Sequence, residues 1–379
     1  MKILIAGDLA PAQSNFDLFN SGSTEQLLGE ELLRIWNSAE ARIFNLETPL
    51  ADSETPIDKC GPNLVAPTNT VKGIKALTPS LLSLANNHIM DQGVRGLDST
   101  RKTLEQNNIS YVGVGDDVTH SGKAHVLEMA GFRVGFYACA EHEFSIATES
   151  SPGANPFDPL ESLDHIADLK ARSDFVIVLY HGGKEYYRYP SPYLQKVCRK
   201  MAEKGADLVV CQHSHCVGCF EQSKESIIVY GQGNFIFDLL NRTEWQTGLI
   251  VKVDITGKPD IEFVPIVKKG NVVRLAKEKD AQEILSGFQE RSRQIQQEGF
   301  IQEQYRTFAK ENLESYLRRV AGMGKWMSRI DRYLFKGLLL RLKYNKAKLL
   351  ALQNYIECEA HREVLLEALK QYGNRGWKE

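Results

Sequence analysis

Residues 205–221 read GADLVVCQHSHCVGCFE, an apolar run that passes directly into a block of polar residues. The run Asp207–Cys211 has the length and the β-branched content of a buried strand. Gln212-His213-Ser214-His215 follows at the strand's end, and two histidines at i and i+2 can each bind one metal ion of a pair. Chance pairs with this spacing are also common, so the block is informative only beside others of its kind.

The same arrangement, a polar block at the end of an apolar strand, recurs along roughly the first two-thirds of the chain. The other blocks are Gly7-Asp8, Asn45-Leu46-Glu47, Asn86-Asn87-His88 and His181-Gly182-Gly183. Because loops at strand ends converge at one edge of a sheet, we expect all the blocks to build a single site.

Six side chains in these blocks offer mixed oxygen and nitrogen ligands, which suit Mn, Fe, Zn or Mg. They are Asp8, Glu47, Asn87, His181, His213 and His215. Two divalent ions roughly 3.5–4 Å apart can activate a water molecule and clamp a phosphoryl oxygen. A hydrolytic site with two metal ions is therefore the leading interpretation. Each block alone has an ordinary alternative: Asp8 could cap a turn, and His181 could be a core histidine with its hydrogen bonds satisfied.

His88 is the candidate general acid, standing just outside the metal ligands. Asp91 lies close enough in sequence to orient the His88 ring. The remaining polar groups near the blocks are candidates for substrate binding, and these are Asn45, Asn86, Glu185 and Asn234.

The composition indicates an ordinary soluble globular protein. The 379 residues are 42% hydrophobic and 25% charged, and the net charge of -2 gives no reason to expect a nucleic-acid partner. The apolar stretch at the N-terminus is too short for a signal peptide, and no apolar run is long enough to span a bilayer. Seven cysteines without disulfide-framework spacing fit a reducing compartment. We expect a cytoplasmic protein, with peripheral contact to the inner membrane as an option.

Residues 1–277 are predicted to form an α/β domain, because apolar runs alternate with amphipathic stretches such as Glu25–Trp36. The continuous apolar run Asp174–Tyr180 predicts a central strand that is covered on both faces. His125–Met129 and Phe132–Ala138, separated by Ala130-Gly131, predict a hairpin. This mixture favours a pair of sheets with helices outside.

Residues 278–379 are predicted to form a helical extension with breaks near Gly322–Gly324 and Gly373, because from residue 280 they lack proline and are rich in Glu, Gln, Lys, Arg and Leu. Residues 318–348 hold ten Lys or Arg against one acid, Asp331. Aromatic residues such as Trp326 are interleaved with these cations, and a basic amphipathic helix of this kind can lie on an anionic membrane surface. The more ordinary alternative is a helix whose apolar stripe packs on the catalytic domain.

Six motifs together carry a family resemblance. They are GD at 7–8, FNLETPL at 44–50, LANNHIMDQG at 84–93, LYHGGKEY at 179–186, GADLVVCQHSHCVGCFE at 205–221 and IIVYGQGNFIFD at 227–238. In this order they resemble the CapA-type poly-gamma-glutamate and capsule biosynthesis proteins, a branch of the calcineurin-like metallophosphoesterase superfamily. The resemblance implies a four-layer αββα sandwich, an α/β fold with the metal site at the strand ends.

By position, the resemblance implies two divalent metal sites that share Glu47. One site would be held by Asp8, Glu47 and His215, and the other by Glu47, Asn87, His181 and His213. His88 would be the acid or would stabilise the transition state. The wider superfamily has Asp-x-His where this chain has Asp8-Leu9-Ala10, so the first site lacks one histidine and should bind metal more weakly.

The resemblance also implies a function. The expected activity is that of a metal-dependent, phosphoesterase-like hydrolase in capsule, poly-gamma-glutamate or surface-polysaccharide biosynthesis. Its substrate would be a small molecule or a polymer precursor. The alternative is a weakly catalytic or non-catalytic factor that assembles or binds the machinery of polymer synthesis.

Overall fold

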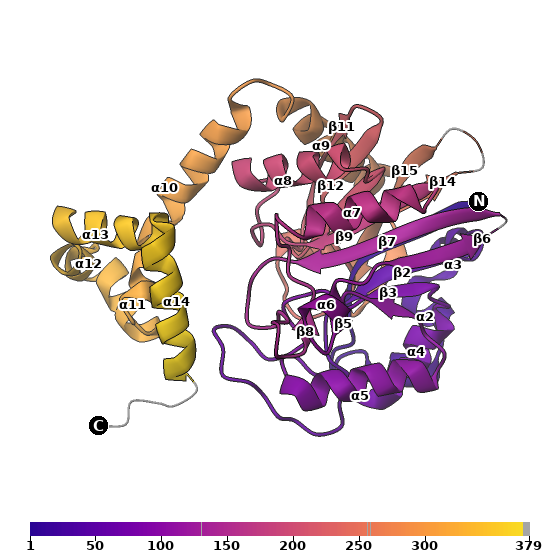
Figure 1. Ribbon diagram of the computed structural model, residues 1–379, viewed down its shortest axis with the longest axis horizontal. Coiled ribbons are helices and arrows are strands. Elements are labelled where there is room, and N and C mark those ends of the chain that lie inside the picture. The colour runs from indigo at the N-terminus through magenta and orange to yellow at the C-terminus, as the bar shows by residue number, and fades with distance from the viewer. Residues whose placement is uncertain (130, 256, 258, 374–379) are drawn as a thin grey trace. The chain divides into compact units, whose positions relative to one another are not determined.

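Two mixed β-sheets lie at the centre of the first of two units, residues 1–301, in a computed structural model of the chain (Figure 1). The structure describes residues 1–129, 131–255, 257 and 259–373. The first sheet has the strand order β16 (Val272–Leu275), β15 (Asp260–Lys269), β14 (Thr247–Asp254), β1 (Lys2–Ala10), β2 (Ala41–Leu46), β3 (Leu81–Ser83) and β4 (Tyr111–Val112), and β13 (Asn234–Phe237) also pairs with β1. Strands β1 to β4 and β13 run parallel, so their carboxyl ends reach the same edge.

The second sheet contains the predicted central strand. Its order is β11 (Val217–Ser223), β12 (Ser226–Gln232), β10 (Leu208–Gln212), β9 (Phe175–His181), β7 (Phe132–Ala140) and β6 (His125–Met129). Strand β9 has neighbours on both sides and is buried along its whole length, as predicted. The predicted hairpin is present as β6 and β7, while Ala130 lies outside the described residues.

Helices cover the outer face of each sheet. The first unit contains α1 (Phe16–Ser21), α2 (Thr24–Leu28), α3 (Glu30–Asn37), α4 (Val71–Ala76), α5 (Gly93–Gln106), α6 (Val118–Ser121), α7 (Ser162–Ala171), α8 (Pro192–Glu203) and α9 (Glu278–Gln294). Alternate residues of β9 face opposite ways, as they must in a strand. Ile177 and Leu179 join the core shared with the first sheet, whereas Val176 and Val178 pack in a second core with residues of α7 and α8. The four-layer αββα arrangement is therefore confirmed.

The chain breaks a helix and a strand region at glycines. The helix predicted over Glu25–Trp36 is two helices, because Gly29 has a φ of 72°, which a right-handed helix cannot accommodate. The Arg274 guanidinium donates to the carbonyl oxygens of Gln26 and Leu27 at the end of the first helix. At Gly113, which has a φ of 88°, the chain leaves β4, and β5 (Val114–Gly115) pairs with β8 (Gly153–Ala154). Strands β8, β11, β13, β15 and β16 were not predicted.

The second unit, from residue 302 onward, is helical, which confirms a helical C-terminal region. Helix α9, which the sequence placed in the extension, belongs to the first unit. Most of α10 (Phe300–Val320) belongs to it, followed by α11 (Lys325–Tyr333), α12 (Leu338–Lys343), α13 (Lys346–Glu357) and α14 (Glu359–Gly373). The break predicted at Gly322–Gly324 separates α10 from α11. The break predicted near Gly373 falls at the limit of the described residues. Within that limit, no helix is both long and apolar enough to cross a bilayer.

Candidate metal centre

The six predicted metal ligands meet at the edge where the parallel strands of both sheets end. β1 carries Asp8, Glu47 follows β2, and Asn87 follows β3; His181 ends β9, and the histidines of the 212–215 block follow β10. All six side chains are buried, and none is more than 7% exposed. The convergence of strand ends, here called the strand-end rule, therefore places residues that are up to 207 positions apart in one site, as the span from Asp8 to His215 shows.

Gly7 allows the close approach of two strands beside Asp8. An added Cβ at Gly7 would stand 2.0 Å from the carbonyl oxygen of Gly233, which immediately precedes β13. The registers of β1 with β2 and with β13 both shift around Asp8, as at a β-bulge. Only glycine leaves room for this packing, which sets the position of the Asp8 carboxylate.

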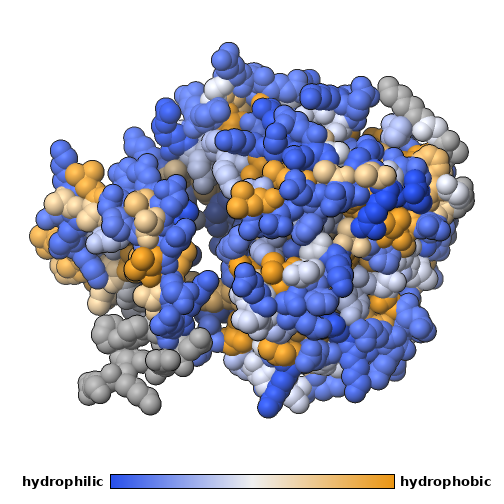
Figure 2. Space-filling view, viewed as in Figure 1, coloured by the Kyte–Doolittle hydropathy of each residue, from blue (hydrophilic) through white to orange (hydrophobic). Residues whose placement is uncertain are grey.

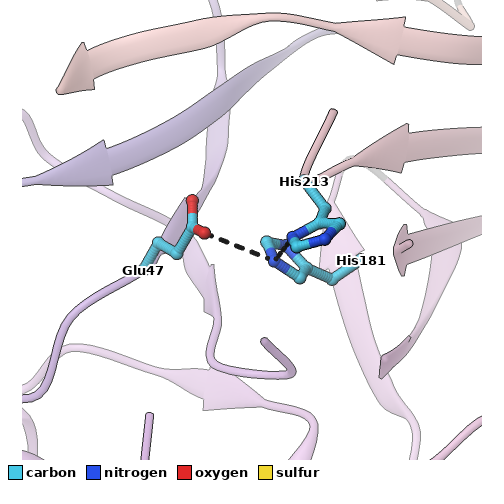
Figure 3. Close-up of side chains that lie close together, drawn as sticks. All are labelled: Glu47, His181 and His213. Atoms are coloured by element: carbon cyan, nitrogen blue, oxygen red, sulfur yellow. Dashed lines mark hydrogen bonds and ion pairs between the residues drawn. The ribbon is translucent and has the colours of Figure 1, made fainter. Parts of the chain in front are cut away.

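One group of candidate ligands comprises Glu47, His181 and His213, whose ligand atoms lie within 4.8 Å of one another. Figure 3 shows the Glu47 carboxylate pointing toward the His181 ring, with the His213 ring beside it. His181 Nε2 is 3.5 Å from Glu47 Oε1 and 3.1 Å from His213 Nδ1. The Asn87 side-chain oxygen is 3.0 Å from the same His181 nitrogen, so it can complete this group.

A second group comprises Asp8, Glu47 and His215, and it shares Glu47 with the first. His215 Nδ1 is 3.7 Å from Asp8 Oδ2, and His215 Nε2 is 3.9 Å from Glu47 Oε1. The His215 ring stacks on Trp245 with a centroid separation of 4.6 Å. The division into two groups around one bridging carboxylate is the one that the family resemblance implied.

Burial changes the proton affinities of this cluster. Desolvation raises the pKa of Glu47 to about 8, against the opposing effect of His88, and it raises the pKa of Asp8 to about 6. Desolvation lowers the pKa of both His181 and His215 to about 4. The histidines are therefore neutral near pH 7, which is the state in which an imidazole can bind a metal ion.

Both carboxylate oxygens of Glu47 are buried and have no hydrogen-bond partner among the described residues. An ionised carboxylate without a partner is costly to bury, because it loses its hydration and gains no compensating contact. A cation between the two groups would supply the missing partner. The donor set thus fits a divalent metal pair.

The loop that carries two of the histidines has an uncommon backbone conformation. His213 and His215 have φ values of 79° and 53°, in the left-handed region that few non-glycine residues adopt. The loop is held by hydrogen bonds from the His213 amide to Asp8 Oδ2, at 3.2 Å, and from the Tyr186 amide to the Ser214 carbonyl, at 2.9 Å. Such strain at a cluster of ligand side chains is typical of a functional site.

His88 lies beside the two groups and belongs to neither of them. Its Nδ1 is 2.6 Å from Asp91 Oδ2, so Asp91 does orient the ring. Asp91 is fully buried and also accepts a hydrogen bond from the Leu64 amide at 2.6 Å. The third partner of Asp91 is the Lys59 ammonium, whose side chain is only 3% exposed and whose Nζ is 3.3 Å from His88 Nδ1. Sequence reasoning missed Lys59, because nothing in its loop distinguishes it from a surface lysine.

The four candidates for substrate binding lie in different environments. Asn45 and Asn86 are completely buried, and their amides are used inside the protein. Asn45 Nδ2 donates to Asp8 Oδ1 at 2.8 Å, and Asn86 Nδ2 donates to Asn45 Oδ1 at 3.0 Å. Asn234 Oδ1 is 2.9 Å from a ring nitrogen of His215, while its Nδ2 is buried without a partner among the described residues. Glu185 is half-buried.

Two further acidic residues reach the centre, and sequence reasoning missed both. Glu141 Oε1 is 3.4 Å from His213 Nε2, and Glu143 Oε2 accepts a hydrogen bond from Asn87 Nδ2 at 3.3 Å. Together with His213 they form a third group that could hold a cation. Both follow the end of β7 at Ala140, so the strand-end rule could have found them.

The comparison with protein families matches this part of the chain. The model of the family described as "Bacterial capsule synthesis protein PGA_cap" matches residues 2–239. The capsule biosynthesis protein CapA of Bacillus anthracis is 33% identical over 203 residues, which are 51% of this chain and 49% of that protein. The PGA biosynthesis protein CapA of Bacillus subtilis (strain 168) is 31% identical over 173 residues, 45% of each chain. The chain spans about half the length of these curated relatives.

Solved structures that align with the chain include a phosphatase from Mycoplasma pneumoniae, at 14% identity and a TM-score of 0.45, over 71% of this chain and 94% of that one. A 5'-nucleotidase precursor from Thermus thermophilus has 15% identity and a TM-score of 0.40, over 76% of this chain and 58% of that one.

The family match runs from β1 through β13 and includes all six candidate ligands. Since it covers well over half of the chain, this protein belongs to the bacterial capsule synthesis family PGA_cap.

Proposed function

We propose that this protein is a metal-dependent hydrolase with phosphoesterase-like chemistry that acts in capsule, poly-gamma-glutamate or surface-polysaccharide biosynthesis. Its substrate would be a small molecule or a polymer precursor. The observation that carries the proposal is the Glu47 carboxylate, which is buried without a hydrogen-bond partner among the described residues. It is shared by two groups of candidate ligands, one with His181 and His213 and the other with Asp8 and His215. The relatives' names, which refer to capsule and PGA biosynthesis, support the pathway.

The proposed roles follow from the two groups. Glu47, Asn87, His181 and His213 would hold one ion, and Asp8, Glu47 and His215 would hold a second one more weakly. When bound, such ions supply positive charge that stabilises a phosphoryl oxygen and lowers the pKa of a water molecule. The weaker site is the one with a single histidine. Asn45 and Asn86 would orient the ligands, and Asn234 and Glu185 would remain candidates for substrate contact.

His88 is proposed to act on the leaving group. Asp91 accepts the hydrogen bond of Nδ1, so in the imidazolium form of His88 the proton on Nε2 is the one that can pass to a leaving oxygen, which leaves the ring neutral. Lys59 Nζ also pairs with the buried Asp91, so the carboxylate that orients the ring is itself held in place by a second side chain. This arrangement separates the metal ligands from the proton donor.

The test measures metal content and Mn-stimulated cleavage of an aryl phosphate by the purified protein. We expect bound transition metal near stoichiometry, and a loss of both metal and activity in His213→Ala and in Asn87→Ala. His120→Ala is the matched control, because that histidine is exposed on α6. Unchanged metal content and activity in both site variants would show that the centre is misassigned.

A second candidate function is that of a weakly catalytic or non-catalytic assembly factor, and the reduced ligand set around Asp8 favours it. It would be supported if the protein bound no metal and cleaved no phosphoester with Mn.

The cytoplasmic location remains part of the proposal. Its support is that all seven cysteines are free thiols.

A further inference from the structure

Residues 319–348, here called the basic segment, expose positive charge with no exposed acid. The segment's single acid, Asp331, is fully buried and accepts hydrogen bonds from Arg318 Nε at 3.1 Å and from the Leu339 amide at 3.0 Å. The pairing with Arg318 thus removes the one negative charge from the surface. The exposed charged side chains that remain are Arg319, Lys325, Arg329, Arg332, Lys336, Arg341, Lys343, Lys346 and Lys348.

Within the basic segment, α11 presents an apolar face that is exposed. Trp326, Ile330 and Tyr333 follow the i, i+4, i+7 spacing of one helix face, and they are 77%, 42% and 75% exposed. Met327 and Leu334 flank this face and are 53% and 74% exposed. Figure 2 shows hydrophobic residues at the surface of the helical unit, among hydrophilic ones.

The cations of α11 lie beside this apolar face. With 3.6 residues per turn, Lys325, Arg329 and Arg332 occupy the neighbouring arc of the helix. Asp331 faces the interior of the second unit. The helix therefore has three faces: one packed, one cationic and one apolar.

We propose that the basic segment binds the surface of an anionic lipid bilayer, with the apolar face of α11 at the boundary between headgroups and acyl chains. Cations with no competing exposed acid complement the charge of anionic headgroups. Trp and Tyr, each with an apolar body and a polar tip, are the side chains favoured at that boundary. A hydrophilic polyanion would pair with the cations and leave the apolar face of α11 in water, so the exposed aromatic residues favour lipid.

The experiment measures co-sedimentation of the full chain with vesicles of phosphatidylcholine, with and without phosphatidylglycerol. We expect binding only when phosphatidylglycerol is present. The triple variant Trp326→Ser/Tyr333→Ser/Leu334→Ser should bind at least about tenfold more weakly, because binding scales with buried apolar area as well as with charge. These three side chains are exposed, so the fold should be retained, as an unchanged far-UV circular dichroism spectrum would verify.

A control for non-specific electrostatic attraction removes positive surface charge from the first unit. Lys72→Gln/Lys75→Gln/Lys102→Gln changes three exposed lysines of α4 and α5 and should leave vesicle binding unchanged. The proposal is overturned if the intact chain does not sediment with the anionic vesicles, or if the apolar variant binds as well as the intact chain. The second result would identify a purely electrostatic surface suited to a hydrophilic polyanion.

Discussion

Replacing Glu47 by Gln should stabilise the metal-free protein while removing its response to metal. Both Glu47 oxygens are buried without a hydrogen-bond partner among the described residues. A neutral amide of the same shape carries no charge to desolvate. The Glu47 side chain should therefore favour metal binding and, when no metal is bound, lower the free energy of unfolding.

The magnitude follows from the pKa of Glu47, which burial raises from 4.5 to about 8. The folded state then holds the proton more tightly than the unfolded state, so stability falls as pH rises above 4.5. The fall ends once the folded group also ionises, near pH 8. Each pH unit in this window costs about 1.4 kcal/mol, which amounts to roughly 3 kcal/mol at pH 7. The Glu47→Gln variant has no ionisable group at this position, so its free energy of unfolding should not fall in this way.

The assay is urea denaturation of both metal-free proteins between pH 5 and pH 9. The two should have similar stability near pH 5, and the variant should be more stable by about 3 kcal/mol at pH 7. Glu149→Gln, at an exposed position, is the control and should match the wild type throughout. Asp8 is present in both proteins, so the cost of burying its own carboxyl group is common to both.

Added Mn provides the second half of the test. At a concentration 100 times its dissociation constant, a ligand that binds only the folded state adds about 2.7 kcal/mol of stability. The wild type should gain this amount, and Glu47→Gln should gain little. The reasoning is refuted if the metal-free variant is no more stable than the wild type at pH 8, or if Mn stabilises the two proteins equally.

Three other substitutions test the role of His88 as proton donor, the Lys59–Asp91 pair beside it, and the close packing at Gly7. His88→Ala should retain metal and lose turnover in the aryl phosphate assay, whereas a loss of metal would make it a ligand. Lys59→Met should lower the free energy of unfolding in urea by about 3–5 kcal/mol, because a buried carboxylate loses its ammonium partner; a change below about 1 kcal/mol would contradict the buried pair. Gly7→Ala should lower both the melting temperature and the metal content, because the added Cβ would meet the Gly233 carbonyl oxygen. Gly324→Ala, which meets no atom within 4 Å, should change neither, and equal effects of the two glycine substitutions would refute the packing argument.

Much of the fold could be predicted from local patterns. The apolar run of β9 has the continuity of a strand covered on both faces, and the structure buries all of it. The break at Gly29 was missed because the Arg274 guanidinium, which donates to carbonyl oxygens at the end of α2, comes from a strand far away in sequence. Amphipathic spacing continues across the break, so the sequence pattern alone indicates a single helix.

The candidate site likewise contains residues that local patterns predict and one that only tertiary contacts reveal. Asp8, Glu47 and the histidines could be predicted because each sits at a strand end, and parallel strands must end at a common edge. Lys59 reaches His88 from a loop without a readable pattern, and only tertiary contacts reveal it.

By itself, the sequence determined the α/β alternation, the strand-end ligand set, the family resemblance and the basic composition of the helical tail. Only the tertiary structure decided that Glu47 has no hydrogen-bond partner among the described residues, that Lys59 pairs with Asp91, and that Asp331 is buried. The physical reason is that periodicity reports which face of an element is apolar. Pairing and desolvation of single polar groups depend instead on residues brought together from distant parts of the chain.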